Sequence, residues 1–161
     1  MKADGGYLIS QIHKIGGRIF NELLRESGVE EFNGPQGRIL YSLWDDKILT
    51  IKEISKKTGL AKTSLTSMLK RMENSKLIEK VENNDDRRST KIKLTNKAKT
   101  LKDKYENVSN KIGKIYYKGF NEDEIINFEN YLKRILNNLE GKDEWFKKDS
   151  NKRKRSRYNF D

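Results

Sequence analysis

Two adjacent arginines in a charged turn are the residues of this chain whose spacing is most informative. Arg87 and Arg88 follow the cluster 83–86, Asn-Asn-Asp-Asp, and both residue types favour tight backbone bends. The run 77–82 before the cluster has strand character, and the run 86–95 passes from a charged loop into an alternating strand. This pattern predicts a β-hairpin with arginines at its tip.

Arginines at such a tip suit a narrow DNA minor groove, which concentrates negative potential. Asp86 stands two residues before Arg88, where it can pair with that side chain and hold it extended. The alternative is a solvated charged turn that contributes little energy.

A helix is expected to begin at Ala61, with Leu65, Met68, Leu69 and Met72 facing inward. Its other positions carry short hydroxyl side chains and cations, which can approach DNA phosphates and base edges closely. With Arg87, Arg88 and Lys91 from the hairpin, they form the predicted DNA-contacting set: Lys62, Thr63, Ser64, Thr66, Ser67, Lys70 and Arg71. An ordinary surface helix is the alternative.

The residues before this helix predict how it is positioned. Asn33-Gly34-Pro35 reads as a helix start, with Asn as the cap and Pro in the first turn. Thr50 and Glu53 have the spacing of a capping box, and Gly59 breaks the short helix that follows. The order of two helices, a turn and a hairpin predicts a winged helix-turn-helix, a fold that binds duplex DNA.

Long amphipathic helices are expected on both sides of this lobe. Apolar residues recur at intervals of three and four in the segments 8–23, 101–116 and 125–139, and Gly141 is the expected helix stop. Three such stripes exceed what a small lobe can cover, and helices with shared seams usually form bundles. We therefore expect a second copy of the chain as the partner, with a monomeric helical hairpin as the alternative.

Composition narrows the function further. The 161 residues carry a formal net charge of +11, which points to a polyanionic partner. The chain has no cysteine and a single histidine, His13, and no apolar run approaches the roughly 20 residues that cross a bilayer. Acidic pairs stand only where helix ends or turns explain them. We expect a cytoplasmic protein without cofactor, metal or membrane contact, and not an enzyme.

The end of the chain, 147–161, has seven basic residues against two acidic ones, a net of +5, with almost no aliphatic content. We expect this tail to lack regular structure in isolation. It could attract DNA without sequence preference, lie on a membrane surface, or serve only solubility.

From about Tyr7 to Gly141 the chain resembles the MarR family of bacterial transcriptional regulators. The resemblance includes 60–66 as the start of the recognition helix, 77–80 as the first wing strand, and Gln36 with Ile39-Leu40 in the second helix. The wing signature of the family appears as Asp86, Arg88, Ile92, Leu94 and Thr95.

The resemblance implies a mainly α-helical fold with a small β-hairpin wing. It implies a domain over 1–146, with the DNA-binding lobe at about 33–95 and dimerisation helices at about 7–27 and 96–141. It further implies a homodimer on a palindromic operator, a repressor released by a small anionic or phenolic effector, with Arg88 in the minor groove and Asp86 as its support.

Two details bear on this expectation. Lys76 stands where the family usually has glycine before the wing strand, a position that often needs a left-handed backbone. Tyr7, His13, Tyr41 and Trp44 are candidates for an effector pocket, although they could equally be core residues. Two other functions remain open: a ligand-independent, nucleoid-type DNA-binding protein whose affinity comes mainly from the tail, and a module whose helical stripes bind another protein.

Overall fold

The computed structural model describes the backbone of residues 3–45, 47–83 and 89–157, with side chains in these ranges up to residue 143. The chain divides into two compact units, Met1–Tyr116 and Tyr117–Asp161. Among the residues that the structure describes, no helix has the length and apolarity to cross a membrane.

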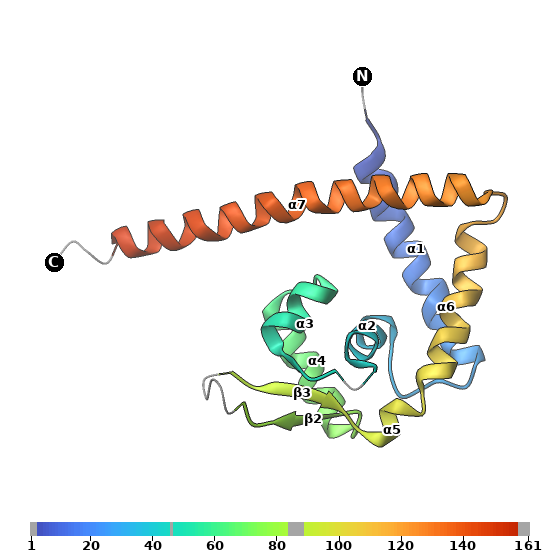
Figure 1. The fold of residues 1–161 in the computed structure, drawn as a ribbon, viewed down its shortest axis with the longest axis horizontal. Coiled ribbons are helices and arrows are strands. Elements are labelled where there is room, and N and C mark those ends of the chain that lie inside the picture. Colours follow the sequence, from blue (N-terminus) through green and yellow to red (C-terminus); the bar gives the residue numbers. More distant parts are fainter. Residues whose placement is uncertain (1–2, 46, 84–88, 158–161) are drawn as a thin grey trace. The chain divides into compact units, whose positions relative to one another are not determined.

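The first unit contains a helical lobe with a small sheet and two longer helices (Figure 1). Its elements in chain order are α1 (Gly5–Glu26), α2 (Gly34–Leu43), β1 (Leu49–Thr50), α3 (Ile51–Thr58), α4 (Lys62–Asn74), β2 (Ile78–Val81), β3 (Lys91–Leu94), α5 (Asn96–Lys99) and α6 (Lys102–Tyr116). The mainly α-helical fold with a small β wing is confirmed.

The helix starts of the lobe follow the predicted caps. Asn33 accepts a hydrogen bond from the Gln36 amide, and the Gln36 side chain accepts one from the Asn33 amide, which closes a capping box on α2. Thr50 and Glu53 form the same arrangement on α3. Gly59 ends α3 with φ 68°, a left-handed conformation that glycine adopts without steric cost.

The sheet has three antiparallel strands in the order β1-β3-β2, so the predicted hairpin gains a third strand. β2 pairs with β3 in the register Ile78↔Leu94 and Lys80↔Ile92, and β1 adds Leu49↔Ile92 on the other side. β1 has only two residues, too short for a periodic pattern to reveal it.

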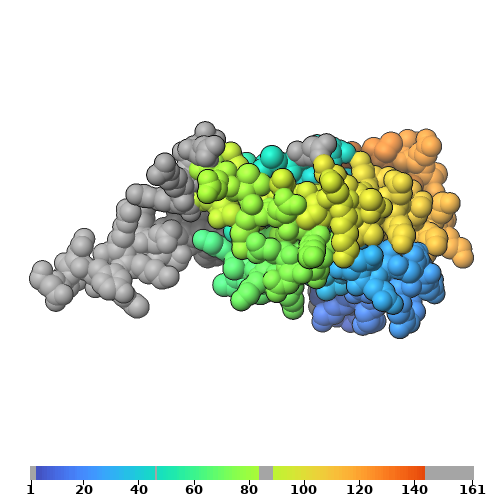
Figure 2. All heavy atoms as spheres, turned by 90° about the horizontal axis from the view of Figure 1, so that it is seen from below, coloured from blue at the N-terminus to red at the C-terminus, as the bar shows by residue number. Residues whose placement is uncertain are grey.

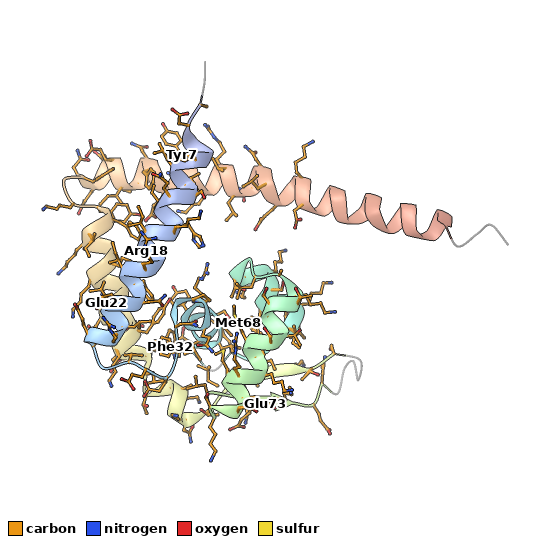
Figure 3. All side chains as sticks on the ribbon, turned by 180° about the vertical axis from the view of Figure 1, so that it is seen from behind. Tyr7, Arg18, Glu22, Phe32, Met68 and Glu73 are labelled. Carbon is orange, nitrogen blue, oxygen red and sulfur yellow. The ribbon has the colours of Figure 1, made fainter. Side chains whose placement is uncertain are left out.

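One hydrophobic core holds the lobe together. Fully buried side chains come from α2 (Ile39, Leu40), α3 (Ile54), α4 (Leu65) and β3 (Ile92). Met68 lies on the inner side of α4, packed against this core, as Figure 3 shows. Burial of each large aliphatic side chain contributes about 1.5–3 kcal/mol, which fixes the orientation of α4 in the lobe.

Helix α6 packs along α1, and Figure 2 shows the two in direct contact. The apolar stripe of 101–116 is largely covered inside this unit, because Leu101, Tyr105, Val108 and Ile112 are buried, while Ile115 at its end is exposed. The predicted helix from 96 is also divided: Thr95 caps the single turn α5, and α6 begins at Lys102. Only part of the three predicted stripes therefore needs a partner.

The second unit is dominated by α7 (Glu122–Arg157). Asn121 and Glu124 cap it, with Asn121 Oδ1 accepting from the Glu124 amide at 2.9 Å. The helix passes Gly141 and continues through 147–157, where the sequence led us to expect no regular structure. Lysine and arginine have high helix propensity, and the only proline of the chain is Pro35, so nothing in this segment breaks the helix.

Candidate nucleic-acid interface

Helix α4 presents a polar face to solvent on the side opposite its buried residues. All seven of its predicted DNA-contacting residues are exposed, while Leu65, Leu69 and Met72 are buried. The exposed residues are Lys62, Thr63, Ser64, Thr66, Ser67, Lys70 and Arg71. One helix face therefore carries four hydroxyl groups and three cations.

Two of these hydroxyl groups bond to the helix itself. Thr66 Oγ1 donates to the Lys62 carbonyl and Ser67 Oγ donates to the Ser64 carbonyl, each at a distance of 2.9 Å. Each keeps lone pairs that can accept from a base amino group, whereas donation to a phosphate requires the hydroxyl hydrogen to turn away from the helix carbonyl. Ala61 supplies no side-chain cap to α4, so the first turn lacks the side-chain bond that begins α2 and α3.

The predicted wing tip, with Asp86, Arg87 and Arg88, lies outside the described residues. The strands that lead to it are described, and β2 and β3 pair as far as Val81↔Lys91. Lys91 is half-buried at this end of β3.

Lys91 also lies close to a carboxylate. The pKa of Glu53 is lowered, first by the hydrogen bonds that it accepts from the backbone and side chain of Thr50, and further by the positive charges of Lys91 and Lys57. Part of the positive charge of Lys91, one of the predicted DNA-contacting residues, therefore acts on the carboxylate of the α3 cap.

A groove that the sequence did not reveal opens beside this face. It has a volume of about 460 Å³ and is lined by residues of α3, the first residue of α4, and Ser89 and Thr90 before β3. The residues come together only in the folded chain, so no sequence motif marks the groove.

Aromatic rings gather where α1, α2 and α6 meet. Tyr105 of α6 lies 4.9 Å from the Trp44 ring and 6.0 Å from the Tyr41 ring, centroid to centroid, and Phe20 and Phe32 also contact it. Burial raises the pKa of Tyr105 above its usual value. Trp44 is 3% exposed, and its indole Nε1 has no hydrogen-bond partner among the described residues.

The four residues predicted for an effector pocket are thus divided. Tyr41 and Trp44 share this aromatic cluster, with ring centroids 6.1 Å apart, although Tyr41 is 65% exposed. Tyr7 and His13 are exposed on α1, and Figure 3 shows Tyr7 near the N-terminal end of that helix. At 1.5 Å per residue, Tyr7 lies about 20 Å along the helix axis from Phe20, the α1 residue in the cluster.

In the described part of the chain, no group of three or more His, Cys, Asp or Glu side chains is arranged to hold a metal ion.

Comparison with protein families gives a match to the MarR family over residues 32–90. The curated HTH-type transcriptional regulator TtmR of Methylorubrum extorquens is 33% identical over 97 residues, which are 60% of this chain and 48% of TtmR. The HTH-type transcriptional regulator MgrA of Staphylococcus aureus is 28% identical over 102 residues, 63% of this chain and 68% of MgrA. The match thus spans about half the length of TtmR.

Solved structures extend the similarity over more of the chain. A MarR variant from E. coli in complex with operator DNA superposes with a TM-score of 0.73 at 26% identity, covering 81% of this chain and 92% of that one. A MarR transcriptional regulator from Methanosarcina mazei shares the fold with a TM-score of 0.74 at 19% identity. The superposition covers 85% of this chain and 96% of that one.

Proposed function

The chain belongs to the MarR family, and from this premise we propose that it is a transcriptional regulator that binds duplex DNA as a homodimer on a palindromic operator. The observation that carries the proposal is the exposed face of α4, where seven hydroxyl-bearing or cationic side chains stand opposite a buried apolar side. Phosphate contacts from such a face position the helix, and contacts to base edges read the sequence.

The operator complex of the similar E. coli protein supports the same use of the lobe in this chain. The net charge of +11 supports it as well, because contacts with phosphates dominate the affinity for DNA. In this proposal α4 enters the major groove, and the wing, with Arg88 supported by Asp86, reaches the minor groove.

Dimerisation is proposed from the apolar side chains that each unit leaves exposed. In the first unit these include a group in the N-terminal half of α1, with Leu8 at 52%, Ile12 at 48% and Ile15 at 46% exposure. In the second unit, α7 exposes Ile126, Phe128, Tyr131, Ile135, Leu136 and Leu139. A second copy that covered both surfaces would place two recognition helices about one DNA turn apart.

Release by a small anionic or phenolic effector is proposed from the aromatic cluster around Tyr105. A buried donor without a partner costs about 1–3 kcal/mol, and the indole N–H of Trp44 is such a donor among the described residues. A carboxylate or phenolate oxygen placed there would accept from it. We propose repression as the regulatory outcome and the cytoplasm as its location.

The alternative function is DNA coating without sequence preference, favoured by the basic end of α7. The segment 147–157 is helical and carries seven lysines and arginines against one aspartate. In that case most of the affinity for DNA would come from this segment, and the face of α4 would contribute little to the discrimination between DNA sequences.

The test is selection from a pool of random duplexes by the full chain at physiological salt, followed by sequencing of the retained DNA. We expect an enriched palindrome with half-sites about one turn apart. Retention without an enriched sequence would favour the coating function, and absence of retention would overturn DNA binding altogether.

A further inference from the structure

The groove beside α4 connects three elements that the proposed function treats separately. Its volume of about 460 Å³ lies between the N-terminal part of α3, the start of α4 and the residues that lead into β3. Among the described residues, its polar lining consists of Thr50, Lys52, Ser55, Lys62, Ser89 and Thr90.

The charges of the groove suit an anion. Two ammonium groups line it, and no carboxylate belongs to its described lining. The acidic neighbour, Glu53, is committed to the α3 cap, where its carboxylate accepts from the amide of Thr50 at 2.7 Å and from the Thr50 hydroxyl at 2.8 Å. Its negative charge is further offset by Lys91 and Lys57, which help to lower its pKa.

The hydrogen-bond donors of the groove can be narrowed to a few groups. The Ser55 hydroxyl donates to the Leu60 carbonyl at 2.8 Å, and the Thr50 hydroxyl donates to Glu53, so both are structural. The ammonium groups of Lys52 and Lys62 have three donors each, and the Thr90 hydroxyl has one. A phosphate accepts hydrogen bonds through several oxygens, and charge-assisted bonds of this type are the stronger ones.

We propose that this groove seats one phosphate of a DNA strand, held between Lys52 of α3 and Lys62 of α4, with Thr90 at the β3 side. This inference rests on the proposed function, because it names the positioning residues of the same DNA-binding surface. One phosphate held in this way fixes the recognition helix and the base of the wing to the same point of the backbone. Lys52 and Thr90 thus set the register of the protein on DNA without reading bases.

The first experiment compares Lys52→Gln with Lys57→Gln in the full chain. Both residues are exposed on α3, but five positions separate them, so they point about 140° apart around the helix. Binding to the selected operator and to a random duplex is titrated over a series of salt concentrations, and circular dichroism checks that each variant is folded.

For Lys52→Gln we expect a loss of about three- to tenfold in affinity for both duplexes, and a salt slope smaller by about 0.9, the value for one phosphate. Lys57→Gln should keep the wild-type slope. Equal behaviour of the two variants would overturn the proposal, as would a loss confined to the operator, which would make Lys52 a base-reading residue. If the wild type binds no duplex, the proposed function fails with it.

A second experiment asks whether Lys52 and Lys62 hold the same phosphate. If they do, the double variant Lys52→Gln, Lys62→Gln loses less affinity than the product of the two single losses, because the first substitution already weakens the shared contact. Multiplicative losses would overturn a shared phosphate.

Inorganic phosphate has the same chemistry as the backbone group, so its effect on the thermal unfolding of the wild type and of Lys52→Gln is measured in parallel. One outcome is that phosphate raises the unfolding temperature of the wild type but not of Lys52→Gln, while the variant binds DNA as the wild type does. This outcome would assign the groove to a small phosphorylated ligand and overturn the DNA contact.

Discussion

The hydroxyl of Thr95 donates a hydrogen bond of 2.7 Å to the backbone carbonyl of Lys76, which joins the end of β3 to the corner between α4 and β2. The same oxygen accepts from the Ala98 amide and so begins α5. Lys76 adopts φ 56° at this corner, a left-handed conformation that is unfavourable for a residue with a Cβ. The end of β3 is thus anchored to the corner that follows α4 through a strained residue.

Replacement of Lys76 by glycine should relieve that strain. A left-handed conformation costs a non-glycine residue about 1–2 kcal/mol, while glycine adds conformational entropy to the unfolded chain, so we expect a net stabilisation of up to about 1 kcal/mol. Lys76→Asn should stabilise less, and Lys76→Val should destabilise, because β-branching disfavours positive φ. Urea unfolding of the three variants provides the measurement; a glycine variant no more stable than the valine variant would contradict it.

Two helical glycines should respond differently to alanine. A Cβ on Gly37 of α2 would lie 2.7 Å from the buried Tyr105 ring, which has no room to move. A Cβ on Gly16 of α1 would meet the hydroxyl end of Tyr116, a side chain that is 46% exposed and can rotate away.

We expect Gly37→Ala to lower the free energy of unfolding by about 1–3 kcal/mol, the usual cost of overpacking. Gly16→Ala should be nearly neutral, because the gain of about 1 kcal/mol in helix propensity offsets the displacement of Tyr116. Chemical denaturation of the pair tests this, since each variant is the other's control. A Gly37→Ala protein as stable as the wild type would show that the aromatic cluster is loosely packed.

The raised pKa of Tyr105 predicts a loss of stability in alkali. Burial disfavours the phenolate in the folded state, so the group stays neutral there while the unfolded chain ionises near pH 10. The contribution is therefore fully present below about pH 10 and is lost as pH rises toward the folded pKa. Unfolding free energies of the wild type should fall more steeply than those of Tyr105→Phe above pH 10. Parallel profiles would mean that the ring is accessible to water.

Local signals in the sequence predict much of this fold. The caps at Asn33 and Thr50 and the stop at Gly59 act through a few neighbouring residues, and the structure has each of them. The left-handed backbone at Lys76 was also expected, since the resemblance places glycine there.

Features that depend on distant residues were not predictable in the same way. β1 exists because Leu49 and Thr50 pair with β3, and the groove exists because Lys52, Lys62 and Thr90 are brought together by folding. The periodic stripes revealed which faces are apolar, but not that α6 would bury most of its own stripe against the rest of its unit.

The role of Arg88 can be tested against its own neighbour. From the resemblance, we expect Arg88 to enter the minor groove. Arg87 carries the same charge one position earlier, so electrostatic attraction alone would make the two equivalent. We expect Arg88→Ala to weaken operator binding by about 1–3 kcal/mol, on the order of one good groove contact, and Arg87→Ala to weaken it less. Asp86→Ala should reproduce part of the Arg88→Ala loss, because the support of that side chain is removed.

Gel-shift titrations at one fixed salt concentration compare the three variants. Equal losses at the two arginines would reduce the wing to a general positive charge, and an unchanged affinity for Arg88→Ala would remove the wing from the proposed interface.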